Sequence, residues 1–225
     1  MESPLRVRYQ TIEFGDTDIH LCTLRDRHQF SDPDGIAAKL GICSAAWPIF
    51  GVIWPSSLVL ANCMLDHATE GKRILEVGCG MALSSLMLNK QQRDITATDN
   101  HPEVGTFLAR NTSLNGDDPI AYERTDWSDD DDSLGLFDLI IGSDLLYEDQ
   151  HIRQLADFID NHAQPTCEVI VVDPGRGRKN KMRQRMEQLG YHSEQNSPSH
   201  TDYLDTPFKG HILRYWRDEP AEAVG

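Results

Sequence analysis

The sequence lacks the long apolar segments that mark membrane and secreted proteins. None of its uninterrupted apolar stretches approaches the roughly 18 residues that a membrane-spanning helix needs. Its first residues, MESPLRVRYQ, contain no apolar core of the kind found in a secretory signal. We therefore expect neither a transmembrane helix nor secretion, and no membrane partner.

Patterned cysteines and histidines are also missing. The five cysteines include no C-x-x-C pair, and the nine histidines show no H-E-x-x-H spacing. Disulfide frameworks and zinc sites need such patterns, so we predict neither a disulfide framework nor a metal site. An odd, scattered set of cysteines is typical of the reducing cytoplasm, where we expect the protein to be located.

Positive charge is scarce in this chain. Its 21 lysines and arginines stand against 36 aspartates and glutamates, which gives a formal net charge of −15. Such a surface repels phosphates, so nucleic acid is not an expected partner. The basic run GRGRKNKMRQR at 175–185 is too small to reverse this, and it is typical of a solvated helix face.

What the chain does contain is an alternation of predicted strands and helices. The expected strands are 73–78, 94–99, 121–127, 137–144 and 168–174, and the expected helices are 83–90, 102–114, 149–162 and 178–189. This order predicts a parallel sheet with helices on both faces. Two more strands, 191–195 and 211–217, are expected as an antiparallel pair.

The N-terminal part has a different pattern. Residues 5–25 alternate around Gly15-Asp16 and predict a β-hairpin. A short helix is expected after Asp32-Pro33, and a longer one from Pro55. Without a repeat or a linker, we predict one domain over 1–225, with 1–50 as an N-terminal extension of a 51–225 core.

A glycine-rich turn lies between the first core strand and its helix, in ILEVGCGMALSS at 74–85. A dinucleotide fingerprint requires G-x-G-x-x-G/A, and Leu83 stands at its third position. The chain has instead an acidic residue, two glycines and a small residue, at Glu76, Gly78, Gly80 and Ala82. Glycines here let the backbone approach a ligand without a Cβ in the way.

Carboxylates follow successive strands of the predicted sheet. Asp99 ends the second core strand, nineteen residues after Gly80, where a carboxylate can accept hydrogen bonds from both ribose hydroxyls of a nucleoside, with Asn100 beside it. Glu76, Asp126 and Asp144 stand at or near the ends of the first, third and fourth strands. Since open parallel sheets bind ligands at these ends, we expect a nucleoside-containing cofactor there.

These motifs resemble those of the seven-strand methyltransferases that use S-adenosylmethionine. WPSS at 54–57, EVGCG, TATDNHP, TDW and IIGSDLLYED resemble the protein-lysine methyltransferase branch in particular, over about residues 45–190. That branch carries a [D/E]-x-x-[Y/F] signature after its fourth strand, matched here by Asp144 and Tyr147.

The resemblance implies a fold, a cofactor and a set of site residues. The fold is an α/β, Rossmann-like, doubly wound and mostly parallel seven-stranded sheet with an antiparallel C-terminal strand. The cofactor is S-adenosylmethionine, with Asp126 and Trp127 beside its adenine. The complete implied set is Trp54, Glu76, Gly78, Gly80, Asp99, Asn100, Asp126, Trp127 and Ser143 for the cofactor, and Asp144 and Tyr147 for catalysis.

The chemistry of these residues suits transfer of a methyl group to nitrogen. A free lysine amine has a pKa of about 10.4 and must lose a proton before it attacks. Asp144 is expected to hold and orient the incoming ammonium, and Tyr147 to form a wall or a second polar contact. Aromatic faces such as Trp47 and Trp54 favour cationic groups, although both residues also suit core packing.

Other functions stay open at this point. The leading hypothesis is an enzyme that methylates a protein lysine. The alternative enzyme methylates a small amine or a nicotinamide-like N-heterocycle. A cavity closed by residues 1–50 favours the small substrate, and an open acidic groove favours a protein. A non-catalytic cofactor-binding module and an NAD-dependent oxidoreductase are the remaining alternatives, and the oligomeric state is open, with a monomer possible.

Overall fold

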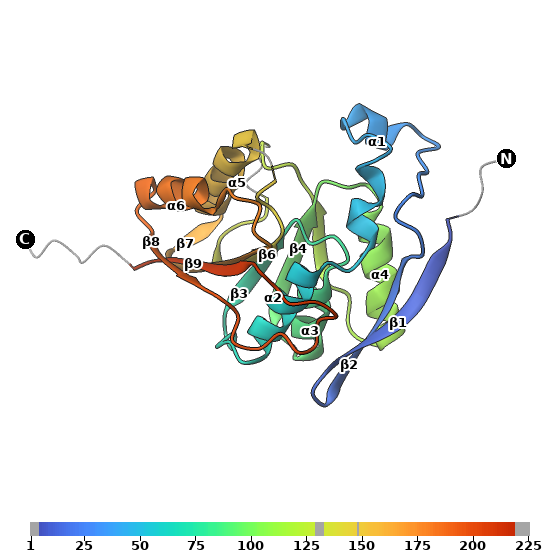
Figure 1. Cartoon of the computed structure of the whole chain (residues 1–225), viewed down its shortest axis with the longest axis horizontal. Helices are drawn as coiled ribbons and strands as arrows, with labels where there is room; N and C mark the ends of the chain where they lie inside the picture. Colours follow the sequence, from blue (N-terminus) through green and yellow to red (C-terminus); the bar gives the residue numbers. More distant parts are fainter. Residues whose placement is uncertain (1–4, 129–132, 148, 219–225) are drawn as a thin grey trace, which may run out of the picture.

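A seven-stranded sheet forms the centre of the molecule (Figure 1). The structure, a computed structural model, describes residues 5–128, 133–147 and 149–218. The strand order is β5-β4-β3-β6-β7-β9-β8, in which the first five strands run parallel, β9 is antiparallel to β7, and β8 to β9. The strands are β3 (Arg73–Val77), β4 (Asp94–Asp99), β5 (Ala121–Arg124), β6 (Phe137–Ser143), β7 (Ala163–Asp173), β8 (His192–Asn196) and β9 (His211–Arg217). The predicted fold class is confirmed.

Helices cover both faces of the sheet, as a doubly wound fold requires. One apolar core joins the sheet to α2 (Pro55–Leu65), α3 (Leu83–Lys90) and α4 (Val104–Asn115). A second core joins the other face to α5 (Asp149–Asn161) and α6 (Lys179–Gln188). The apolar run Leu139, Ile140 and Ile141 in β6 is fully buried because both of its faces are covered.

Several element boundaries differ from the sequence prediction, and the largest difference is at β7, which begins at Ala163 instead of residue 168. Helix α4 begins at Val104 instead of Pro102, because residues 101–104 form a turn in which the N–H of Val104 donates to the His101 carbonyl. Strand β5 ends at Arg124 instead of at residue 127. There the carboxylate of Asp126 accepts hydrogen bonds from Ser128 and turns the chain away from the sheet.

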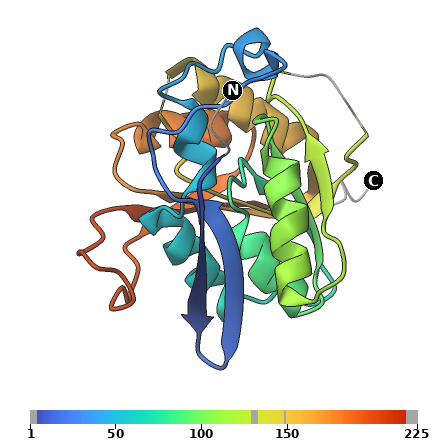
Figure 2. The same ribbon diagram turned by 90° about the vertical axis from the view of Figure 1, so that its right-hand side faces the viewer.

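The N-terminal hairpin forms a two-stranded sheet of its own and does not extend the central one. Strands β1 (Val7–Phe14) and β2 (Thr17–Leu24) pair around Gly15, and the hairpin lies along α4 (Figure 2). The side chain of Asn111 accepts a hydrogen bond from the Cys22 N–H at 2.7 Å. Asn115 bonds both backbone groups of His20 at 2.8 Å, so two asparagines of α4 hold strand β2.

The segment between the hairpin and β3 contains short helices. Helix α1 (Ile36–Lys39) begins where the Asp32 carboxylate accepts the N–H groups of Ala37 and Ala38, close to the predicted start. The 3₁₀ helix η1 (Trp47–Gly51) and then α2 follow.

Part of this segment passes a test of length and composition for a membrane-spanning helix. Trp47–Leu65 is long enough and apolar enough by composition to cross a membrane, with a mean hydropathy of 1.6. In the structure it is interrupted between η1 and α2, and its buried residues, such as Trp47 and Leu60, pack in the core beside the sheet.

Candidate functional site

The candidate site lies at the carboxyl ends of the central strands. Strand β3 pairs with β4 on one side and with β6 on the other, so the connections leave the sheet in opposite directions there. Such a switch point leaves a crevice above the strand ends. Glu76, Asp99 and Asp144 lie within or directly after β3, β4 and β6, as the sequence predicted.

The glycine-rich turn joins β3 to α3 through left-handed backbone conformations. Gly78 has φ +59° and Gly80 has φ +52°, and Ala82 adopts φ +53° without being a glycine. A Cβ on Gly80 would lie 3.2 Å from the Phe50 carbonyl oxygen, and one on Gly78 would lie 2.6 Å from Leu145 Cδ2. The glycines are thus required by the backbone path and by close packing, before any ligand is considered.

Glu76 is buried below this turn. Its Oε2 accepts hydrogen bonds from both the N–H and the hydroxyl of Ser85, in the first turn of α3. Burial raises the pKa of the Glu76 carboxyl to about 7, against the lowering effect of these hydrogen bonds. In this structure Glu76 holds α3 to β3. Its contact with the cofactor stays a prediction.

Asp99 connects strand β4 to the glycine turn. Its Oδ2 accepts the Gly80 N–H at 2.9 Å and its Oδ1 accepts the His101 N–H at 2.8 Å. Burial raises the pKa of this carboxyl above its usual value. Since a carboxylate oxygen accepts two hydrogen bonds, each oxygen keeps the capacity to accept a ligand hydroxyl.

The predicted adenine neighbours lie together on the other side of the turn. The Asn100 amide donates to Asp126 Oδ2 at 2.9 Å, which links the ends of β4 and β5. The half-buried Trp127 reaches the glycine turn, where a Cβ on Gly78 would lie 3.6 Å from its ring. The structure therefore brings Gly78, Gly80, Asp99, Asn100, Asp126 and Trp127 into one connected group.

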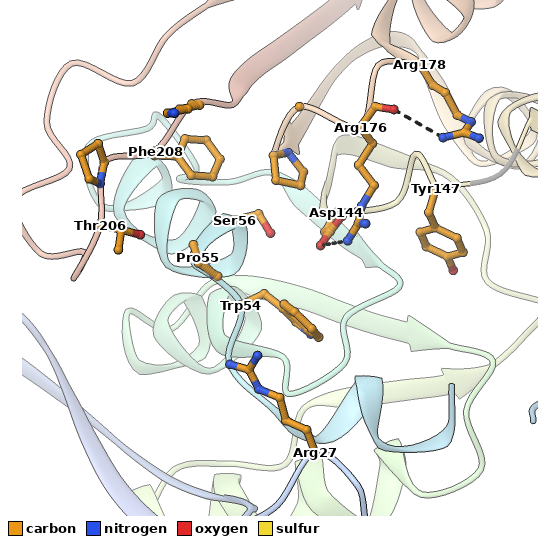
Figure 3. A pocket seen from close by; sticks show the side chains of 14 residues that line it. Arg27, Trp54, Pro55, Ser56, Asp144, Tyr147, Arg176, Arg178, Thr206 and Phe208 are labelled. Carbon is orange, nitrogen blue, oxygen red and sulfur yellow. Dashed lines mark hydrogen bonds and ion pairs between the residues drawn. The ribbon is translucent and has the colours of Figure 1, made fainter. Parts of the chain in front are cut away.

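A separate cavity of about 690 Å³ opens beside Asp144 (Figure 3). Its walls come from five parts of the chain: Arg27 before α1, the start of α2, the end of β6, the end of β7 and the segment before β9. They include Trp54, Ser56, Asp144, Tyr147, Arg176 and Phe208. Ser143, the half-buried last residue of β6, is not in these walls.

Asp144 is the central carboxylate of this cavity. It adopts φ +58°, and its N–H donates to the Val172 carbonyl at 2.8 Å. Its two carboxylate oxygens accept hydrogen bonds from Arg176 Nε at 2.5 Å and from Nη2 at 2.7 Å. A left-handed aspartate costs conformational energy, and such residues concentrate at functional sites.

Sequence reasoning missed Arg176. The basic run containing it was interpreted as a solvated helix face, but Arg176 and Arg178 precede α6 and line the cavity. Gly175 has φ +100° and Gly177 has φ +82°, and this backbone path brings the intervening arginine back to Asp144. The sequence signal that could have indicated this arginine is the G-R-G at 175–177, directly after the strand expected at 168–174.

The aromatic residues of the prediction separate into two groups. Trp54 and the half-exposed Tyr147 line the cavity, and the Arg27 guanidinium lies 5.3 Å from the Trp54 ring centroid. Trp47 is fully buried against Phe50 and has no face turned to a substrate. For Trp47, core packing is therefore the role that the structure supports.

The cavity matches neither of the two expected forms. Of the described residues in 1–50, only Arg27 contributes to its walls, so the N-terminal segment does not close it. It is also not an acidic groove, because its walls include four cations and Asp144 as their single carboxylate among the described residues.

Comparison with known proteins identifies the family. Residues 45–189 match the model of a family described as lysine methyltransferase. The chain is 30% identical over 119 residues to a histidine protein methyltransferase 1 homolog from Dictyostelium discoideum, covering 50% of this chain and 38% of that protein. It is 26% identical over 152 residues to a calmodulin-lysine N-methyltransferase from Arabidopsis thaliana, covering 62% and 50%.

Solved structures confirm the fold. Magnesium protoporphyrin IX methyltransferase from Synechocystis with bound S-adenosylmethionine superposes with a TM-score of 0.58 at 15% identity, covering 86% of this chain and 89% of that one. The chain spans half or less of the length of the two curated relatives described above.

Proposed function

The chain belongs to the lysine methyltransferase family, and we therefore propose that it transfers a methyl group from S-adenosylmethionine to the side-chain amine of a lysine in another protein. One observation supports this most directly. Leu145, inside the D-x-x-Y signature, packs against Gly78 of the glycine turn. Its neighbour Asp144, in the cavity wall, therefore lies next to the group of residues suited to a cofactor. A donor site and an acceptor cavity thus share one edge of the sheet.

The residues of the glycine turn fit S-adenosylmethionine, which supplies an activated methyl group. Asp99 retains acceptor capacity for two ribose hydroxyls, and Trp127 offers an aromatic face beside Gly78. The amide of Asn100 and the carboxylate of Asp126 provide a polar edge next to that face. The preference of this turn for S-adenosylmethionine over NAD, predicted from Leu83, agrees with the family.

The charges in the cavity walls favour the neutral, reactive form of the target amine. A lysine amine attacks only when it is neutral, and nearby positive charges lower the pKa of an ammonium group. Arg176 supplies such a charge and also neutralises Asp144, which would otherwise favour the protonated amine. Each Asp144 oxygen can still accept a second hydrogen bond and orient the amine through its remaining N–H.

The alternatives have weaker support. A small amine would be better served by an enclosed cavity, and among the described residues the N-terminal segment contributes only Arg27 to the walls of this one. A non-catalytic module would not need a left-handed aspartate bonded by two hydrogen bonds at the cavity wall. Methylation of a protein lysine remains the proposal.

The first experiment is calorimetric titration of the purified protein with S-adenosylmethionine and, separately, with NAD. We expect binding of S-adenosylmethionine alone, abolished in Asp99→Ala. A lysate incubated with radiolabelled S-adenosylmethionine is then expected to show labelled proteins whose label resides on lysine by mass spectrometry. Binding of NAD, or label only on small molecules, would contradict the proposal.

A further inference from the structure

The mouth of the cavity carries positive charge in a strongly acidic protein. Arg27, Arg176, Arg178 and Lys209 line it, and Asp144 is the one acidic residue among its described walls. The chain as a whole has a formal net charge of −15. Cations are therefore concentrated at the place where an acceptor would enter.

Two of these cations are already neutralised by neighbours. Arg176 is paired with Asp144, and Arg178 Nε lies 2.8 Å from a carboxylate oxygen of Asp149. Arg27 and Lys209 are exposed, and within residues 5–128, 133–147 and 149–218 neither makes an ion pair. The two available charges come from different walls, one before α1 and the other directly before β9.

Deeper in the cavity, a buried hydroxyl also lacks a partner. Ser56 is only 1% exposed, and its Oγ has no hydrogen-bond partner in the described structure. Figure 3 shows this hydroxyl directed into the cavity, between Trp54 and Asp144.

We propose that the acceptor is a lysine flanked by acidic residues, whose carboxylates bind Arg27 and Lys209 at the cavity mouth. This inference rests on the proposed function and specifies its substrate. A short acidic segment needs only the local positive rim, because charges more than about 10 Å away are largely screened at moderate salt. A nucleic acid follows a longer surface, where the acidic remainder of the protein repels it.

The test uses three fluorescent peptides that contain one lysine flanked by aspartates, by glutamines or by arginines. Binding to the full chain is measured by anisotropy in saturating S-adenosylhomocysteine. Since one exposed ion pair changes affinity by up to about fivefold, we expect the acidic peptide to bind about fivefold or more tightly than the neutral one. The double variant Arg27→Gln/Lys209→Gln is expected to lose this preference.

A matched control removes two other exposed cations. Arg153→Gln/Arg183→Gln changes the net charge by the same amount, at α5 and α6 positions outside the cavity walls. It is expected to keep the preference for the acidic peptide. The single variant Lys209→Glu is expected to favour the arginine-flanked peptide instead.

Separate readouts distinguish the two proposals. Equal binding of all three peptides, or a preference that the Arg27/Lys209 double variant retains, would overturn the inference even if lysine is methylated. Selective binding of the acidic peptide without any methyl transfer would support the inference and count against the proposed function. Tighter binding of a single-stranded oligonucleotide at the same rim would overturn the choice of an acidic protein segment.

Discussion

At the scale of single residues, the pair formed by Asp144 and Arg176 sets the character of the site. The aspartate is held in a left-handed conformation, and the arginine is brought to it by a loop with a glycine on either side. Such a pair combines fixed geometry with a local charge close to zero. On the proposed function, both properties suit a cavity that receives an ammonium group and favours loss of its proton.

The sharpest residue-level prediction concerns Asp144→Asn. The variant keeps the shape of the side chain, but its single oxygen cannot hold Arg176 through two hydrogen bonds and also orient the target amine, so we expect turnover to fall by at least about 100-fold. Binding of S-adenosylmethionine is expected to be unchanged, because Asp99 and the glycine turn lie outside the cavity walls. Methyl-transfer rates and calorimetry measure the two effects.

The matched control is Asp157→Asn, which removes a carboxylate paired with Arg185 between α5 and α6. It is expected to leave turnover unchanged. Equal loss of cofactor binding and turnover in Asp144→Asn would contradict the role proposed for this residue.

Arg176→Gln is expected to change the pH dependence of the reaction. Without its positive charge, Asp144 attracts the target ammonium more strongly and raises its pKa. The acidic limb of the kcat profile, which reports ionisation in the enzyme–substrate complex, is therefore expected to move up by about one pH unit. The profile is measured between pH 6 and 10, with Arg185→Gln as control. If the limb does not move and only the rate falls, the role of Arg176 is purely structural.

At the scale of elements, the glycine turn and the D-x-x-Y segment depend on each other through Leu145. This side chain fills the space left by two glycines, since a Cβ on Gly78 would lie 2.6 Å from Leu145 Cδ2, and one on Gly142 would lie 2.6 Å from Leu145 Cδ1. Leu145 is 4% exposed and follows Asp144 directly. We therefore expect a change in the turn to affect the position of Asp144 as well.

Gly78→Ala tests this dependence. The left-handed conformation costs an alanine about 1–2 kcal/mol, and overpacking against Leu145 adds about 1–3 kcal/mol to the loss of stability. Urea unfolding measures the total, and cofactor affinity and turnover are both expected to fall. Gly116→Ala is the control, because Gly116 has φ +67° with no atom within 4 Å of its added Cβ. A loss no larger than at Gly116 would show that Leu145 moves aside freely.

Much of this element-level architecture could be predicted from the sequence, because periodicity and strand-end residues are local signals. The strand ending at Asp99 and the glycine turn at Gly78 were located correctly. The bond between Arg176 and Asp144 was not predicted, because it joins residues 32 positions apart through the path of a loop. The cavity wall before β9 was missed for the same reason, since no local pattern marks it.

At the scale of the whole molecule, the N-terminal hairpin is attached to α4 through side chains. The alternation of apolar and polar residues in the hairpin predicts only that β1 pairs with β2. It does not predict whether the hairpin packs on the central sheet or on a helix. The decisive contacts come from Asn111 and Asn115, about 90 positions further along the chain. The cytoplasmic location expected from the cysteines stays a prediction.

Asn111→Ala is expected to loosen this attachment. The asparagine is fully buried, and its removal leaves the buried Cys22 N–H without its acceptor, which costs about 1–3 kcal/mol of unfolding free energy. Hydrogen exchange is expected to rise in residues 7–24 before the sheet is affected. Asn62→Ala, where the amide donates to the Leu58 carbonyl of its own helix, is the control. Equal protection of the hairpin in both variants would contradict the docking role.

The cavity walls have an evolutionary consequence. Residues 45–189 match the family, whereas Arg27 and the wall formed by 206–209 lie outside that range. On the proposed function, the donor site and the carboxylate that orients the amine belong to the common core, and the two cations proposed to bind the residues flanking the lysine belong to two short stretches outside it. We therefore expect that exchanging these stretches between relatives changes which protein is methylated and leaves the methyl-donor site intact.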